Sequence, residues 1–136
     1  FPTRRSSDLK KILIIDDDEV IAKYLKKFLE NNGYTTTNAI DGKLGMDMIK
    51  KDKPDLILLD VMMETLYSGF EVYRQVKLDS ELNTIPIIGI SGMSDEIDVK
   101  FDPARDAEYF SPDDFLEKPV DKELLLKKID KLIRTL

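Results

Sequence analysis

Short apolar runs alternate with segments of helical periodicity along most of this chain. Three of the runs are almost unbroken and rich in isoleucine and leucine, which is typical of strands buried on both faces. Two weaker segments, one dominated by threonine and one very short, also favour strands. The expected strands cover residues 12–15, 34–39, 55–59, 85–90 and 115–117.

Between these runs, apolar residues recur at the spacing of an amphipathic helix. Asp18 and Asp121 stand immediately before two such segments, where an aspartate caps the first turn. Asp41 and Gly42 favour a turn, and we expect a loop as far as Gly69 before the third helix. The expected helices include residues 20–29, 44–49, 70–76 and 125–133.

This alternation of strands and helices indicates a parallel sheet. We therefore expect a doubly wound α/β fold, with a five-stranded parallel sheet and helices on both faces, in one domain from residue 10 to residue 136. Residues 1–9 lack periodicity, and their letters FPTRRSSDL resemble the translation of a sequencing-library adapter, so we expect a non-native or disordered tail there. The acidic and aromatic segment from residue 94 to residue 111 holds at most one short helix.

The composition narrows the chemistry that this fold can perform. The 136 residues include no cysteine and no histidine, which excludes disulfides, thiolate nucleophiles and histidine-ligated metals. Any metal must therefore be held by oxygen, which favours Mg²⁺, Mn²⁺ or Ca²⁺. The formal net charge of −6 argues against direct binding of nucleic acid. No apolar run approaches the roughly 20 residues of a membrane span, so we expect a soluble cytoplasmic protein without membrane contact.

Chemically active side chains follow the predicted strands. Asp16 and Asp17 come after the first strand, Asp60 after the third, Ser91 after the fourth and Lys118 after the fifth. In a doubly wound sheet, ligands bind outside the carboxyl ends of the strands. Carboxylates so close together would repel each other unless they shared a cation, whereas the lysine and the serine suit a tetrahedral anion. The pattern predicts a phosphoryl-transfer site in which one aspartate is the nucleophile.

The strand-end residues stand in segments that resemble a known family. The segments KKILIIDDDE, DLILLDVMM, IPIIGISG and DDFLEKPV follow the order found in the receiver domain of two-component response regulators, and the resemblance covers residues 10–136. The resemblance implies a flavodoxin-like fold of the receiver type. It also implies a protein that transmits a signal in a phosphorelay by accepting a phosphoryl group, rather than an enzyme.

The resemblance implies a role for each acidic residue. Asp60 corresponds to the phosphoacceptor, which takes its phosphoryl group from a phosphohistidine on a sensor histidine kinase or a phosphotransfer protein. Asp17 would bind Mg²⁺ directly, with Mn²⁺ as an alternative ion, and Asp16 would bind it largely through water. Asp60 itself and the backbone carbonyl of Met62 would complete the protein ligands.

The resemblance also implies how the phosphorylated state is held and transmitted. Lys118 would contact the phosphoryl oxygens, and Ser91 would move its hydroxyl onto the phosphate beside the amide of Gly92. Phe115 corresponds to the switch aromatic, which turns inward as the hydroxyl moves. The surface of the fourth helix, fifth strand and fifth helix would then change and control a downstream protein. The bond between Lys118 and Pro119 is expected to be cis.

Two segments depart from the family pattern. The loop at residues 62–69 is one residue longer than usual and lacks the proline that follows the Met-Met pair. The segment between Ser91 and Lys118 is also longer, so we expect a short or displaced fourth helix and partner contacts or dimerisation unlike those of standard members. Met62 and Met93 are apolar and cannot orient a water, so we expect slow loss of the phosphoryl group.

Three alternatives compete with the phosphoacceptor. A phosphohydrolase with an aspartate nucleophile needs an acidic residue where this chain has Met62. A flavin-binding electron carrier needs a phosphate loop where this chain has three aspartates. A pseudo-receiver, which is an interaction module that is not phosphorylated, stays open. The oligomeric state and the loss of a downstream output domain also stay open.

Overall fold

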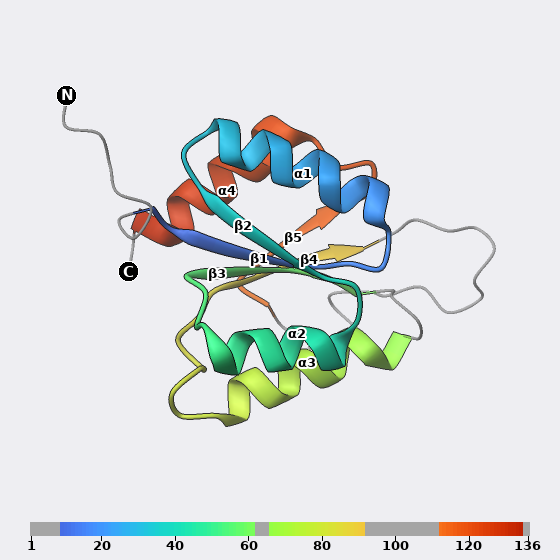
Figure 1. Cartoon of the computed structure of the whole chain (residues 1–136), viewed down its shortest axis with the longest axis vertical. Helices are drawn as coiled ribbons and strands as arrows, with labels where there is room; N and C mark the ends of the chain where they lie inside the picture. Colours follow the sequence, from blue (N-terminus) through green and yellow to red (C-terminus); the bar gives the residue numbers. More distant parts are fainter. Residues whose placement is uncertain (1–8, 62–65, 92–111, 135–136) are drawn as a thin grey trace.

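The computed structural model describes residues 9–61, 66–91 and 112–134. Its strands pair in the order β2-β1-β3-β4-β5, and every neighbouring pair is parallel (Figure 1). These strands are β1 (Lys11–Ile15), β2 (Thr35–Ala39), β3 (Leu56–Asp60), β4 (Ile87–Ser91) and β5 (Asp114–Glu117). The five predicted strands are therefore confirmed, and β3 and β4 end one residue later than expected, at Asp60 and Ser91.

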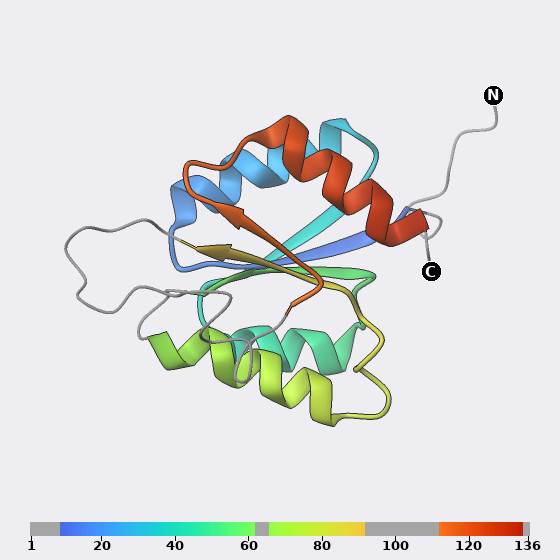
Figure 2. The same cartoon turned by 180° about the vertical axis from the view of Figure 1, so that it is seen from behind.

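Helices cover both faces of this sheet. The described residues form α1 (Glu19–Asn31), α2 (Gly42–Lys51), α3 (Leu66–Leu78) and α4 (Lys122–Arg134). The view in Figure 1 and the reverse view in Figure 2 both place α1 and α4 on one face, and α2 and α3 on the other. The predicted doubly wound α/β fold is confirmed.

Aspartates begin three of these helices. Asp18 Oδ1 accepts hydrogen bonds from the backbone amides of Val20, at 3.0 Å, and Ile21, at 3.2 Å. Asp121 caps α4 in the same way, through two backbone amides of its first turn. Asp41, which the sequence places in a turn, is the N-cap of α2. Each carboxylate satisfies amides that have no partner inside the helix and complements the positive end of the helix dipole.

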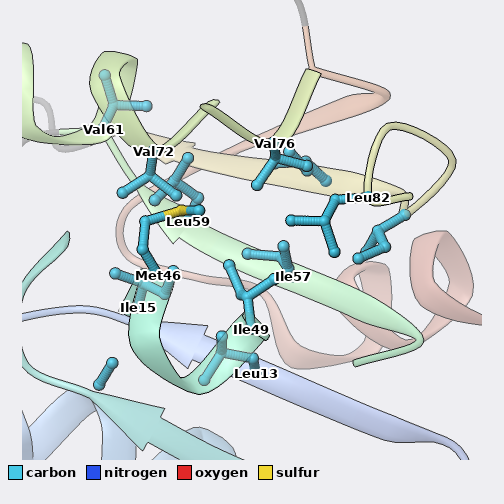
Figure 3. Packing of buried hydrophobic residues seen from close by; sticks show 13 residues of the cluster. Leu13, Ile15, Met46, Ile49, Ile57, Leu59, Val61, Val72, Val76 and Leu82 are labelled. Carbon is cyan, nitrogen blue, oxygen red and sulfur yellow. The ribbon is translucent and has the colours of Figure 1, made fainter. Parts of the chain in front are cut away.

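The sheet separates two apolar layers. Successive side chains of a strand point to opposite faces. Leu13 and Ile15 of β1 therefore pack with α2 and α3, in the layer drawn in Figure 3. Ile12 and Ile14 of the same strand pack with α1 and α4. All five residues of β3 are buried, which explains why its sequence is an apolar run rather than an alternating pattern.

The start of α3 differs from the sequence prediction. Gly69 was expected to close a loop, but α3 begins at Leu66, so Gly69 lies inside the first turn of the helix. A Cβ atom at Gly69 would lie 2.9 Å from the carbonyl oxygen of Asp60 and 3.0 Å from Cα of Val61. The glycine thus marks a close approach between the helix and the end of β3, and the interpretation of it as a loop signal was wrong.

Several sequence expectations fall on residues outside the described ranges. They are residues 1–8 of the tail expected at 1–9, the carbonyl of Met62, the amide of Gly92, the side chain of Met93, the short helix expected within residues 94–111, and residues 92–111 of the long segment between Ser91 and Lys118. The loop departure at residues 62–65 also falls there. Within the described ranges, each helix is too short or too polar to cross a membrane.

Candidate functional site

The carboxyl end of β1 buries one aspartate and exposes the next. Asp16 is 1% exposed, whereas Asp17 is exposed. The amide of Asp16 donates a hydrogen bond to the carbonyl of Ala39, at 3.0 Å, which continues the pairing of β1 with β2. The carboxylate oxygen Oδ1 of Asp16 accepts a hydrogen bond from the amide of Asp18, at 2.9 Å. The turn into α1 therefore holds the Asp16 carboxylate in place.

The end of β3 brings a third carboxylate to the same position. Asp60 is the last residue of β3 and is 1% exposed. β3 pairs with β1 on one side and with β4 on the other, so its end lies next to the end of β1. One carboxylate oxygen each from Asp16, Asp17 and Asp60 lies within 4.8 Å of the other two. The structure therefore brings together the three acidic residues that the sequence places at this edge.

A lysine that follows the edge strand β5 reaches this acidic cluster. The Nζ atom of Lys118 lies 3.2 Å from Oδ2 of Asp60 and 3.5 Å from Oδ2 of Asp16. The backbone amide of Lys118 donates a hydrogen bond to the carbonyl of Ser91, at 2.9 Å, which anchors the residue at the end of β4. The peptide bond between Lys118 and Pro119 is cis. The sequence reasoning did not include the contact between Lys118 and Asp16, because the order of the strands is needed to see it.

The buried charges change the acidity of the groups around them. The pKa of Asp16 is raised to about 7, chiefly by burial and next by the neighbouring charge of Asp60, while the Asp18 amide and Lys118 act in the opposite direction. For Lys118, burial favours the neutral form, but the charges of Asp60 and Asp16 outweigh that effect and raise its pKa. The lysine therefore stays cationic, while the ionised form of Asp16 is disfavoured.

The acidic cluster has the properties of a binding site for a hard cation. The oxygen Oδ2 of Asp16 is buried and has no hydrogen-bond partner among the described residues, although Lys118 lies near it. Among the described residues, three carboxylates face a single lysine in this cluster, which leaves negative charge unbalanced. Carboxylate oxygens are the ligands that Mg²⁺ and Mn²⁺ prefer. The residues present therefore fit a divalent cation, which would relieve the repulsion between Asp16 and Asp60.

The two other described candidates lie on β4 and β5. Ser91 is the last residue of β4 and is paired in register with Glu117 of β5. Phe115 pairs in register with Gly89 and is half-buried against the apolar layer of α2 and α3. Ser91 thus stands at the same edge of the sheet as the carboxylates, whereas Phe115 stands further back along its strand.

Comparison with known proteins identifies the family of this chain. A family model for the response regulator receiver domain matches residues 12–130. The chain belongs to this family. The protein PilH of Pseudomonas aeruginosa is 34% identical over 125 residues, which is 92% of this chain and 98% of PilH. The predicted family resemblance is therefore confirmed, and the chain is a receiver domain of two-component signalling.

This receiver domain covers different shares of its other relatives. The transcriptional regulatory protein CseB of Streptomyces coelicolor is 33% identical over 94% of this chain but only 51% of its own length. Among solved structures, the signal receiver domain of a signal transduction histidine kinase from Syntrophus aciditrophicus has a TM-score of 0.80. It is 32% identical, and the match covers 93% of this chain and 92% of that domain. The receiver domain thus spans nearly all of PilH and about half of CseB.

Proposed function

We propose that this receiver domain accepts a phosphoryl group on Asp60 in a reaction that depends on a divalent cation. The observation that carries the proposal is the cluster of Asp16, Asp17 and Asp60 oxygens within 4.8 Å of one another, with the ammonium of Lys118 at 3.2 Å from Asp60. Asp60 is the acceptor because it lies in the middle of the sheet and is the carboxylate nearest to the lysine.

The proposed donor is a phosphohistidine on a sensor histidine kinase or a phosphotransfer protein. A carboxylate oxygen of Asp60 attacks the phosphorus atom and forms an acyl phosphate. The bond between phosphorus and the histidine nitrogen breaks, and its electron pair stays on the imidazole, which takes up a proton from solvent. Lys118 faces the three oxygens on which negative charge gathers during the transfer, and its ammonium offsets that charge.

In this proposal Asp60 accepts the phosphoryl group and also holds the cation, together with the other two acidic residues. Bound Mg²⁺, or Mn²⁺ in its place, would offset charge on the transferred oxygens. Asp17 is the direct ligand in this proposal because it is exposed, and Asp16 contributes largely through water. The backbone carbonyl of Met62 completes the protein ligands.

The proposed signal leaves through the ends of β4 and β5. Ser91 moves its hydroxyl onto the phosphoryl oxygens, beside the amide of Gly92, and Phe115 turns inward as the serine moves. The altered surface, made by the segment before β5, by β5 itself and by the last helix, then binds a downstream protein. The hydrogen bond from the Lys118 amide to the Ser91 carbonyl supports this route, because it joins the two strand ends.

Phosphorylation with a small donor tests the proposal directly. The purified chain is incubated with Mg²⁺ and acetyl phosphate, and its intact mass is measured with and without a chelator. We expect a gain of one phosphoryl group that requires Mg²⁺ and is lost in Asp60→Ala. The control Asp47→Ala removes an exposed carboxylate of α2 and is expected to retain the gain. A wild-type chain that gains no mass contradicts the proposal and favours a pseudo-receiver.

A further inference from the structure

We infer that Gly69 is a positioning residue for Asp60, an inference that rests on the proposed function of that aspartate. A Cβ atom at Gly69 would lie 2.9 Å from the carbonyl oxygen of Asp60, and 3.0 Å from both Cα and the carbonyl oxygen of Val61. Favourable contacts between carbon atoms lie near 3.5–4.0 Å. Any side chain at position 69 therefore requires α3 and the end of β3 to move apart.

The neighbours of Gly69 cannot rotate out of the way, because they are backbone atoms. The end of β3 is held by the hydrogen bond from the amide of Val61 to the carbonyl of Ile90, at 2.9 Å. On the helix side, Val72 and Val76 are buried in the same apolar layer as Val61 (Figure 3). Neither side of the contact can yield without disturbing packed structure.

A side chain at position 69 would displace the proposed phosphoacceptor Asp60 as well as core residues. The Asp60 carbonyl that would be displaced belongs to the residue whose carboxylate faces Lys118 and the other two acids. Mg²⁺ demands nearly ideal octahedral geometry, so a shift of a few tenths of an ångström at one ligand weakens binding. Gly69 thus lets the first turn of α3 lie against the backbone of Asp60 and fixes where its carboxylate stands.

Gly45 of α2 provides a matched control. It too is a buried helix glycine, and a Cβ atom there would lie 2.7 Å from Cδ1 of Ile15. That atom is the far end of a side chain, which can shift at lower cost than the backbone atoms next to Gly69. Ile15 directly precedes Asp16, so the contact of Gly45, like that of Gly69, is made beside a residue of the acidic cluster.

The test compares Gly69→Ala with Gly45→Ala in two measurements. Isothermal titration calorimetry gives the dissociation constant for Mg²⁺, which we expect to rise about tenfold in Gly69→Ala, the effect typical of losing a group that orients metal ligands. It should stay within about twofold of wild type in Gly45→Ala. In the metal-free protein, amide resonances of Asp60 and Val61 should shift in Gly69→Ala and stay in place in Gly45→Ala.

The two measurements separate this inference from the proposed function. If the wild-type chain binds no Mg²⁺, the proposed function fails, and the metal-free resonances alone decide the role of Gly69. Equal behaviour of the two variants in both measurements overturns the inference. Should Gly69→Ala unfold in buffer, both measurements are repeated in trimethylamine N-oxide, which favours the compact state. A variant that stays unfolded there also overturns the inference, because the glycine then serves the fold as a whole.

Discussion

Leu58 and Asp60 lie two residues apart on β3 and are equally hidden from solvent, at 0% and 1% exposed. Leu58 packs among apolar side chains of α1 and α4, where burial of one leucine stabilises the fold by about 1.5–3 kcal/mol. Asp60 shares its surroundings with the equally buried Asp16 and with the ammonium of Lys118. Burial of a carboxylate is unfavourable unless its charge is balanced by partners.

This difference shows that the same strand serves two purposes. Along most of β3, burial supplies stability. At its last residue, burial holds a carboxylate close to Asp16, and the negative charge of the pair is one that a cation can balance. The pKa of Asp16 is raised by burial and by the charge of Asp60, as expected where negative charge is incompletely balanced. A buried polar group that is incompletely balanced is therefore better evidence for a site than burial or charge alone.

The largest effect is expected in the apolar part of β3. Leu58→Ala leaves a cavity and should lower the free energy of unfolding by about 2–5 kcal/mol, as measured by urea denaturation. Leu78, which is 73% exposed, is the matched control, and Leu78→Ala should change the stability by less than about 0.5 kcal/mol. Similar losses in the two variants would contradict the description of the core.

A smaller loss of stability is expected when the ammonium of Lys118 is removed from the acidic cluster. In Lys118→Met, two buried carboxylates lose the ammonium they share, so the metal-free protein should lose about 1–3 kcal/mol of stability. The side chain of Lys128 is also 23% exposed, but it pairs with the half-buried Asp114. Lys128→Met should therefore cost no more than about 1 kcal/mol. If both variants lose the same stability, the repulsion between the buried carboxylates is weaker than their geometry indicates.

Neutralising one of the carboxylates should raise the stability of the metal-free protein instead of lowering it. The pKa of Asp16 is raised to about 7 in the folded protein, so the fold binds this proton more tightly than the unfolded chain does. Stability from this group is therefore present at low pH and is lost as the pH rises from about 4 to about 7. Asp16→Asn should stabilise the chelated, metal-free protein by about 1–2 kcal/mol at pH 8 and by much less at pH 5.

The control for this prediction is Asp47→Asn, because Asp47 is an exposed carboxylate outside the cluster. Urea denaturation at the two pH values should give the same stability for this variant and for wild type. A destabilised Asp16→Asn protein at pH 8 would show that the carboxylate makes favourable contacts which outweigh its burial.

The smallest change in stability is expected at an ion pair outside the acidic cluster, between Lys11 and Asp52. Nζ of Lys11 lies 2.9 Å from Oδ1 of Asp52, and both side chains are well exposed, so water and salt screen their attraction. Asp52→Asn should leave the urea midpoint almost unchanged at low salt and fully unchanged at high salt. A loss comparable to that in Lys118→Met would mean that exposure does not distinguish the two lysines.

The sequence was sufficient to predict the fold and the membership of the acidic cluster. Unbroken apolar runs identified β1, β3 and β4, and the carboxyl ends of parallel strands meet at one edge, which brings Asp60 to Asp16 and Asp17. The sequence could not tell which of two adjacent aspartates is buried. That difference depends on the turn in which the Asp18 amide binds Asp16.

Gly69 was misinterpreted for a related reason. A glycine before an amphipathic segment usually ends a loop, and nothing in the neighbouring letters shows that the backbone of β3 lies against it. The close approach arises from tertiary packing between α3 and residues that come earlier in the chain, namely Asp60 and Val61. Such contacts become visible only when the elements are placed in space.

The position of β5 at one end of the strand order has a consequence for when the acidic cluster gains its lysine. During synthesis from the amino terminus, Asp16 and Asp60 leave the ribosome well before Lys118, which directly follows the last strand. Until that strand adds to the sheet, the two acids have no ammonium between them. A nascent chain therefore lacks the lysine that the proposed function assigns to the phosphoryl oxygens, and the proposed phosphoacceptor site is incomplete until β5 is in place.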